Sequence, residues 1–114
     1  MVDYKEEQLD RLFAAMADRT RRKMLAMLTQ RVHSVSELGE PFGVTKQSVS
    51  KHLRVLEDAG LVSKEKDGRV QLCQINPAAM DALRKAVDRY QVFWGQRLDS
   101  LDEYIKKRKE GEGR

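Results

Sequence analysis

Residues 45–54, which read TKQSVSKHLR, concentrate side chains that can hold a polyanion. Three of them are cations and none is a carboxylate, while the other polar groups are hydroxyls, an amide and an imidazole. Such a helix face can pair its cations with phosphates and bring its short polar groups to base edges in a DNA groove. The sequence therefore predicts a DNA-recognition helix, with contacts from Lys46, Gln47, Ser48, Ser50, Lys51 and Arg54.

The same segment has the signals of a helix buried on its other side. Thr45 is a good N-cap, because its hydroxyl can accept a hydrogen bond from an amide of the first turn. Val49, Leu53 and Leu56 recur at helical spacing and predict a buried stripe. Gly60 can adopt the left-handed conformation that ends many helices. The helix is thus expected to run from residue 45 to residue 59.

A β-hairpin is predicted directly after this helix. Residues 61–66 and 69–75 resemble strands, and Asp67-Gly68 between them is a strong hairpin signal in which both turn positions need a positive φ. Lys64, Lys66 and Arg69 add cations around the tip. A hairpin after a recognition helix is typical of a winged helix. We expect Lys66 or Arg69 to reach the flanking DNA backbone or minor groove.

Three helices are predicted before the recognition helix. Residues 4–17 form an amphipathic pattern, and Thr20 can cap a second helix that runs to about Gln30. Ser34 and Glu37 have the spacing of a capping box ahead of a short third helix through residue 42, which Pro41 keeps short or bent. Two short helices around a glycine-containing turn predict a helix-turn-helix at about residues 35–59, with the wing at 61–75.

A long helix is predicted at the C-terminal end, from about residue 77 to residue 109. Asn76 can serve as its N-cap and Pro77 as its first residue. At ~1.5 Å per residue it would be roughly 45 Å long, more than a domain of this size can cover. Its apolar stripe, with a stutter of two successive steps of four around Trp94, therefore predicts a two-fold homodimer. The expected interface residues are Leu9, Leu12, Phe13, Leu83, Val87, Tyr90, Trp94, Leu98 and Leu101, and residues 110–114 are expected to be a disordered tail.

Composition agrees with a small regulator. The 114 residues suit one domain over residues 1–109, mainly α with a small β-hairpin, and the net charge of +4 permits nucleic-acid binding. No stretch approaches the ~20 apolar residues of a membrane span, and the N-terminus lacks the apolar segment of a signal peptide. The single cysteine fits a reducing cytoplasm, so a cytoplasmic, nucleoid-associated protein is expected. No arrangement of residues supports catalysis, so an enzyme is not expected.

Several short motifs recur in order between Leu12 and Ile75. They are Ala17-Asp18-Arg19-Thr20-Arg21, Ser36-Glu37-Leu38, Val49-Ser50-Lys51-His52-Leu53, Leu56, Ala59-Gly60-Leu61-Val62 and Gly68-Arg69. On these motifs the segment resembles the ArsR/SmtB family of winged-helix repressors, which usually has a proline where this chain has Arg19. The resemblance implies a homodimeric repressor that binds an inverted repeat in double-stranded DNA.

Many members of that family respond to metals, but this chain departs from their sites. Ser34 and Ser36 occupy the positions of a common cysteine pair, and neutral hydroxyls cannot replace thiolates toward soft ions. The terminal helix has Asp81 and Asp88 but no histidine. The remaining donors, His33, His52 and Cys73, lie far apart in the sequence, so no metal and no cofactor is expected.

Two alternatives remain open on the residues alone. The first is a small-molecule or redox sensor with an effector site at the dimer interface, in which Tyr90 and Trp94 line a cavity or Cys73 is oxidised instead of acting as a small buried hydrophobe. The second is a protein-interaction module with only non-specific DNA affinity. The run Arg21-Arg22-Lys23 is either a solvated helix face or a phosphate contact, and His52 fits helix packing or a phosphate contact.

Overall fold

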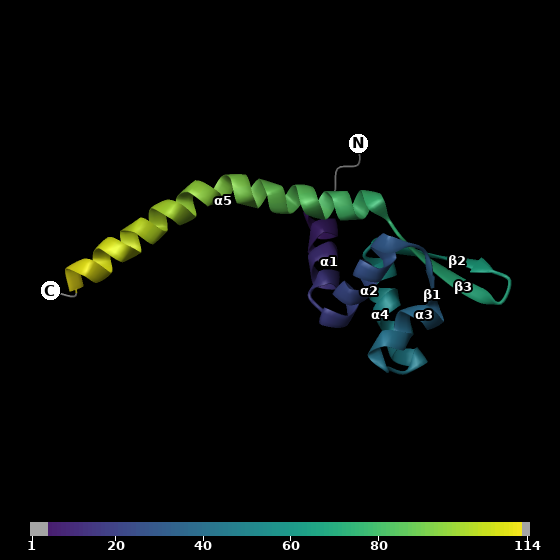
Figure 1. Cartoon of the computed structure of the whole chain (residues 1–114). Helices are drawn as coiled ribbons and strands as arrows, with labels where there is room; N and C mark the ends of the chain where they lie inside the picture. Colours follow the sequence, from purple (N-terminus) through teal and green to yellow (C-terminus); the bar gives the residue numbers. More distant parts are fainter. Residues whose placement is uncertain (1–4, 113–114) are drawn as a thin grey trace. The chain divides into compact units, whose positions relative to one another are not determined.

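The computed structural model describes residues 5–112 (Figure 1). Tyr4, at the start of the predicted first helix, and residues 113–114 of the predicted tail lie outside this range. The chain divides into two compact units, Met1–Leu83 and Arg84–Arg114. The elements in order are α1 (Glu6–Met16), α2 (Arg19–Gln30), β1 (His33–Ser34), α3 (Val35–Gly39), the short 3₁₀ helix η1 (Glu40–Phe42), α4 (Lys46–Asp58), β2 (Val62–Asp67), β3 (Val70–Ile75) and α5 (Pro77–Glu112).

The junction between α1 and α2 differs in detail from the prediction. The N-cap of α2 is Asp18 and not Thr20, because the Asp18 carboxylate accepts a hydrogen bond from the Arg21 amide at 3.0 Å. The Arg21 side chain donates from Nε to the Ala15 carbonyl at 2.7 Å, and Arg22 donates to the Met16 carbonyl at 2.7 Å. Both arginines therefore donate hydrogen bonds to backbone carbonyls at the end of α1. This role differs from the two that were considered for them, a solvated helix face and a phosphate contact.

The helix-turn-helix forms as predicted. Ser34 and Glu37 make a reciprocal capping box at the start of α3. The Ser34 hydroxyl accepts a hydrogen bond from the Glu37 amide at 3.1 Å, and the Glu37 carboxylate accepts one from the Ser34 amide at 3.0 Å. After α3 the chain forms the 3₁₀ helix η1, which contains Pro41. Gly43 then adopts φ 58°, and this turns the backbone toward α4. Thr45 caps α4 by accepting a hydrogen bond from the Ser48 amide at 3.1 Å. The sequence thus predicted both helices and their caps.

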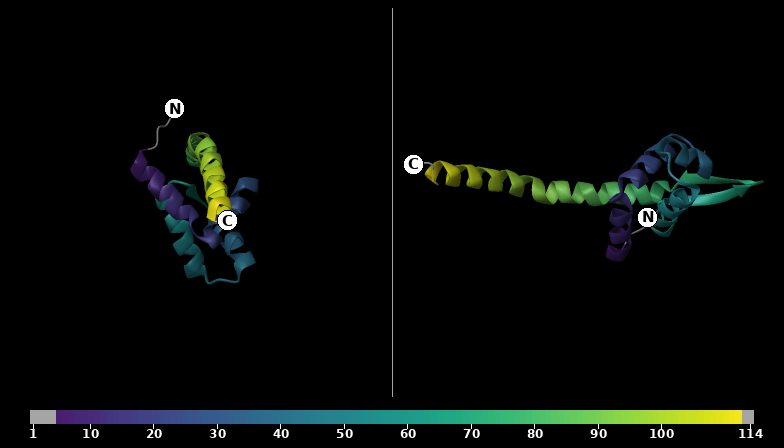
Figure 2. Two further views of the ribbon diagram at one scale, coloured as in Figure 1. Left: turned by 90° about the vertical axis from the view of Figure 1, so that its left-hand side faces the viewer. Right: turned by 90° about the horizontal axis from the view of Figure 1, so that it is seen from below.

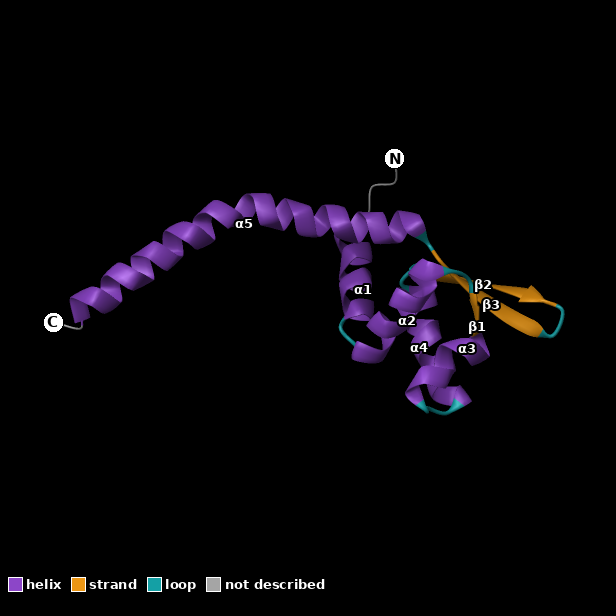
Figure 3. Ribbon diagram, viewed as in Figure 1, coloured by secondary structure: helices purple, strands orange, loops and turns teal. Residues whose placement is uncertain are grey.

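A three-stranded antiparallel sheet with the order β1-β3-β2 forms the wing (Figure 3). Strand β1 was not predicted from the sequence. It is only two residues long, and it pairs with β3 so that His33 lies opposite Cys73. The predicted turn is also displaced by one residue. Asp67 pairs with Val70, so Gly68 and Arg69 are the two turn residues, and Gly68 alone has a positive φ, as in a type II′ hairpin. The ribbon of β2 and β3 extends past the helices of its unit (Figure 2).

The core of the first unit lies under α4. Val49, Leu53 and Leu56 are buried there, as the helical spacing predicted. Burying them keeps the opposite side of α4 in solvent. They belong to a continuous apolar core that includes Leu12, Met24, Leu25, Leu38, Leu61 and Cys73.

The long helix α5 begins as predicted, with the side-chain Oδ1 of Asn76 accepting a hydrogen bond from the Ala78 amide at 3.1 Å. It continues to Glu112, so the expectation that residues 110–112 belong to a disordered tail is wrong. Across residues 5–112, no helix combines the length and apolar character needed to cross a bilayer.

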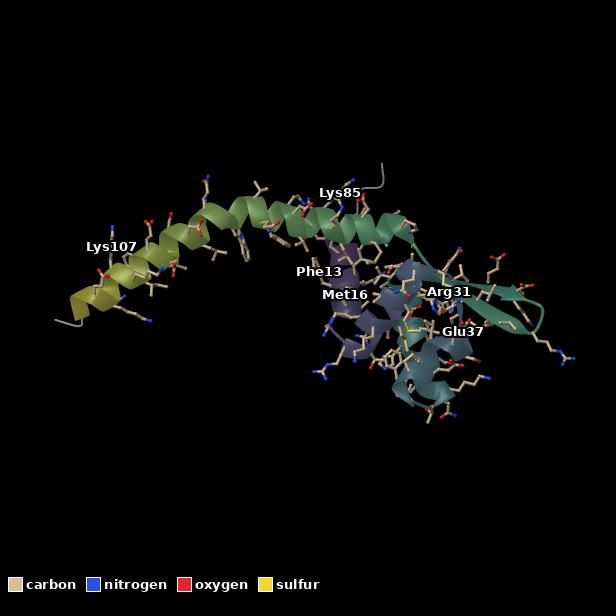
Figure 4. The ribbon with its side chains drawn as sticks, viewed as in Figure 1. Phe13, Met16, Arg31, Glu37, Lys85 and Lys107 are labelled. Carbon is tan, nitrogen blue, oxygen red and sulfur yellow. The ribbon has the colours of Figure 1, made fainter. Side chains whose placement is uncertain are left out.

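The capping box gives a pH-dependent contribution to stability. Arg31 donates a side-chain hydrogen bond to Glu37 at 2.8 Å (Figure 4), and this bond together with the Ser34 amide lowers the pKa of Glu37 to about 2. Because this pKa lies below the ordinary 4.5, the contribution is complete above about pH 4.5 and is lost as the pH falls toward 2.

A Glu37→Gln variant keeps the capping geometry without the charge. Urea unfolding at several pH values is expected to show the variant less stable than the wild type near pH 6 and equal to it near pH 2. A stability difference that stays constant between pH 6 and pH 2 would contradict this assignment.

Candidate nucleic-acid interface

The exposed side of α4 brings together five of the six residues of this helix that were predicted to contact DNA. They line one shallow depression, and each of them is exposed. We call this set the recognition face. It contains three cations and no carboxylate, so its field attracts phosphates along its whole length. Its members are Lys46, Gln47, Ser50, Lys51 and Arg54.

Ser48 does not belong to this set. It is half-buried, it does not line the depression, and its amide donates to the Thr45 hydroxyl at the helix start. One residue along an α-helix turns by about 100°, which moves Ser48 from the recognition face to the flank of α4. The prediction that all six residues contact DNA therefore lacks this geometric support at Ser48.

A second groove brings the wing to α4. Lys46 and Ser50 of the recognition face line this groove together with Arg69 of the hairpin turn. Lys66 is exposed on β2 but does not line the groove. Arg69 and Lys46 are 23 positions apart in the sequence, but both line this groove and so place two cations on one surface. Its other lining residues are Ser34, Val35, Ser36, Val70 and Gln71.

An ion pair holds the wing against α4. The Lys64 ammonium lies 2.9 Å from the Glu57 carboxylate, and both side chains are partly buried. The expectation that Lys64 contributes to the cationic tip is therefore wrong. Its charge is partnered at the base of the hairpin, and the sequence contained no signal for this pair because Glu57 and Lys64 belong to different elements.

A second polar contact links α4 to the α1–α2 junction. The His52 ring nitrogen lies 3.7 Å from the Asp18 carboxylate, whose pKa is lowered chiefly by the hydrogen bond from the Arg21 amide. His52 is partly buried on the flank of α4. Its position agrees with the helix-packing interpretation, since its ring lies beside Asp18 at the α1–α2 junction and does not line the recognition face.

The residues that the structure describes do not bring together the ligands of a metal site. In residues 5–112, no three His, Cys, Asp or Glu side chains gather closely enough to hold an ion. The Ser34 hydroxyl already accepts the capping hydrogen bond. The sheet pairs His33 with Cys73, although they are 40 positions apart, but two donors are fewer than the three or four that zinc requires.

Cys73 is fully buried, and burial raises the pKa of its thiol. A raised pKa keeps the sulfur in the thiol form, which is the less reactive form toward oxidants. The structure thus favours the interpretation of Cys73 as a small core residue, and it gives the redox alternative no support.

The residues expected at a dimer interface divide into two groups. Leu9, Leu12 and Leu83 are buried within the chain itself, so they have little surface left for a partner to cover. Phe13 and the expected α5 residues beyond Leu83 remain exposed. The exposed members are Phe13, Val87, Tyr90, Trp94, Leu98 and Leu101.

Comparison with known proteins agrees with this geometry. Residues 16–65 match a family model described as a helix-turn-helix domain. The HTH-type transcriptional regulator Rv2034 of Mycobacterium tuberculosis is 35% identical over 96 residues, which cover 84% of this chain and 87% of that protein. The arsenical resistance operon repressor of Bacillus subtilis is 36% identical over 72 residues, covering 62% and 69% of the two chains.

Solved structures give the same result for the fold. The ArsR family transcriptional regulator RHA00566 superposes with a TM-score of 0.74 at 38% identity, covering 83% of this chain and 97% of that chain. An ArsR-like transcriptional regulator from Rhodococcus sp. RHA1 superposes with a TM-score of 0.69 at 30% identity, covering 86% and 92%. Winged-helix regulators therefore share both the sequence pattern and the arrangement of helices and wing.

Proposed function

The chain belongs to the ArsR family of transcriptional regulators, and we propose that it is a homodimeric repressor that binds an inverted-repeat operator in double-stranded DNA. It would act by binding and not by catalysis. The observation that carries the proposal is the recognition face itself: five exposed polar or cationic side chains in one depression of α4, with no carboxylate among them. A surface of that kind fits the phosphates of a duplex better than it fits a basic or neutral protein partner.

In this proposal α4 enters the major groove by its N-terminal half. Gln47, Ser50 and Lys51 contact base edges, since glutamine can pair with adenine and lysine with guanine. Lys46 and Arg54, near the two ends of the recognition face, bind phosphates and thereby hold the register of the helix on the duplex. The two protomers would read half-sites about one helical turn of DNA, ~34 Å, apart or a multiple of it.

The wing extends the contact beyond the major groove. Arg69 stands at the hairpin turn and lines the groove that it shares with Lys46 and Ser50. A phosphate bound near that groove would meet cations from both α4 and the wing. We assign to Arg69 the contact with DNA that flanks each half-site.

The Arg69→Ala variant is expected to bind operator DNA about tenfold more weakly for each protomer that loses the contact, which corresponds to ~1.4 kcal/mol. The slope of log K against log salt concentration should become less steep by ~0.9 per protomer, because one phosphate contact is lost. Fluorescence anisotropy titrations at several salt concentrations measure both quantities.

Lys66→Ala is the matched control, because Lys66 is a cation of the same hairpin that lies outside the groove. A smaller loss is expected for it. Wild-type affinity and an unchanged salt slope for Arg69→Ala would remove the wing from the DNA-binding surface.

The proposed dimer rests on the exposed apolar residues of α5. Val87, Tyr90, Trp94, Leu98 and Leu101 each expose between 48% and 55% of their surface, on a helix that otherwise carries many charges. A row of half-exposed large side chains on one helix is typical of an interface that a second chain covers.

The first experiment is selection of bound sequences from a randomised duplex pool at physiological salt, with the mass of the protein in solution measured in parallel. An inverted repeat recovered by a dimer is the expected result. A monomeric mass, or recovery of no motif with affinity that vanishes as the salt concentration rises, would overturn the proposal and favour a protein partner for α5.

A further inference from the structure

A cleft of about 370 Å³ lies between α1, α2 and α4 of the first unit, and it shares no residue with the recognition face. Its floor is apolar, because alanines of α1 and α4 leave room where larger side chains would meet. Val55 of α4 lines the cleft and exposes 40% of its surface. Sites for small molecules have volumes of ~300–1,000 Å³ and mostly apolar walls, so this cleft can hold a small ligand. The alanines are Ala14, Ala15 and Ala59.

One guanidinium is held in place at this cleft. Arg21 donates from Nε to the Ala15 carbonyl at 2.7 Å and from Nη2 to the Ala14 carbonyl at 3.1 Å. These bonds use two of the five N–H groups of the side chain, so the others remain for a ligand. A guanidinium that is already ordered loses little conformational entropy when it binds a planar carboxylate. Arg21 is therefore a preformed carboxylate-binding group.

Two opposite charges complete the lining of the cleft. Arg11 of α1 and Asp58 of α4 are both exposed there. Among residues 5–112, neither side chain forms an ion pair or a hydrogen bond. With Arg21 the cleft has two cations and one carboxylate, so a purely anionic ligand would meet Asp58 as a like charge. A ligand that has an ammonium group beside its carboxylate can pair with all three side chains.

We propose that this cleft binds an α-amino acid with an apolar side chain. The ligand carboxylate pairs with Arg11 and Arg21, its ammonium group pairs with Asp58, and its side chain covers the alanines and Val55. A charged ligand side chain would be buried on the apolar floor without a partner, which disfavours acidic and basic amino acids. The site belongs to a single protomer, whereas the sensor considered from the sequence would form its site at the dimer interface.

Occupancy of the cleft would act on the recognition helix. Asp58 and Arg54 both belong to α4 and are four positions, or about one turn, apart. A ligand ammonium group on Asp58 offsets a carboxylate that otherwise opposes the approach of a phosphate to Arg54. The amino acid is therefore expected to strengthen operator binding. This consequence rests on the proposed function, whereas the site itself does not.

L-Leucine is the first probe, and amide NMR spectra of the full chain report where it binds. Titration without DNA is expected to shift the amide signals of residues 11–15, 21 and 55–59 and to leave those of the wing unchanged. Two analogues test the two charges, because isocaproate lacks the ammonium group of leucine and isopentylamine lacks its carboxylate. Each should bind about tenfold more weakly than leucine, since each leaves a charged side chain of the cleft unpaired.

Asp58→Asn is the decisive variant. It should bind leucine about tenfold more weakly than wild type, and it should no longer prefer leucine to isocaproate, because the like charge is gone. Arg11→Ala should weaken the binding of both ligands. Asp10→Asn and Arg19→Ala are matched controls, since these exposed charges of α1 and α2 do not line the cleft. Both controls should bind leucine as wild type does, and the dispersion of the amide signals shows that each variant is folded.

Absence of amide shifts with millimolar leucine, valine, methionine and phenylalanine would overturn the proposal. Equal affinity of the wild type for leucine and isocaproate would overturn the role of Asp58. Shifts confined to α5 would place the ligand at the dimer interface instead.

Anisotropy titrations of operator DNA test the regulatory consequence. Leucine is expected to raise the operator affinity of wild type severalfold and to leave that of Arg11→Ala unchanged. Binding of leucine with unchanged operator affinity would overturn the regulatory consequence alone. A wild type that binds leucine but selects no operator would overturn the proposed function and keep the site.

Discussion

Replacing Arg54 by alanine is expected to weaken binding to operator and random DNA by about the same factor. Arg54 is exposed at one end of the recognition face and is assigned to a phosphate, which carries no sequence information. Loss of one charged hydrogen bond in each protomer costs about 1.5 kcal/mol, or about a hundredfold for a dimer that loses two. The salt slope should become less steep by ~0.9 per protomer.

Gln47→Ala is the informative partner of this experiment. Gln47 lies on the same face but is assigned to a base edge, where a bidentate pair discriminates by ~1–3 kcal/mol. The variant should lose affinity for the operator, retain affinity for random DNA and keep the wild-type salt slope. Titrations of both duplexes at four salt concentrations separate the two patterns.

Lys23→Ala is a suitable control, because Lys23 is an exposed cation of α2 that does not line the recognition face. It should change neither the affinity for the operator nor sequence discrimination appreciably. Equal effects of Arg54→Ala and Gln47→Ala on operator and random DNA would refute the division of roles between them.

Gly39→Ala is expected to destabilise the fold by about 1–3 kcal/mol, because it overpacks the contact between α3 and α4. A Cβ atom at position 39 would lie 2.6 Å from Cγ2 of Val49, a separation that requires the buried Val49 side chain or one of the two helices to move. The Gly39 backbone itself is right-handed helical, with φ −87°, so lack of space and not backbone strain causes the loss. Urea unfolding at one protein concentration measures it.

A double-mutant cycle with Val49 isolates this contact. Val49→Ala alone should destabilise the protein, since Val49 is buried under the recognition helix. In the double variant the smaller side chain leaves room for the new methyl group, so the combined loss should be smaller than the sum of the two single losses. Additive losses, or a Gly39→Ala protein as stable as wild type, would show that the helices tolerate the methyl group without the clash.

Most of the elements and three of their caps follow from local sequence patterns. Thr45, the pair of Ser34 and Glu37, and Asn76 each act within three residues of their own position, and the buried stripe of α4 follows from helical spacing alone. The polar face opposite that stripe is equally local, which is why most of the recognition face could be named from residue types. Strand β1 was not predicted, because two residues are too few to show the alternation of a strand.

Which of these groups act together depends on how separate elements pack against one another. Arg69 lines the groove with Lys46 because the wing folds back beside α4, and Lys64 is withdrawn from the DNA-facing cations because it meets Glu57. The Arg21 side chain donates to a carbonyl at the end of α1. The Asp18 carboxylate, at the start of α2, lies beside the His52 ring of α4. The physical reason is common to all four, because each depends on which elements pack side by side. The groove needs cations from two elements on one surface, and each of the other three contacts needs a partner within about 4 Å.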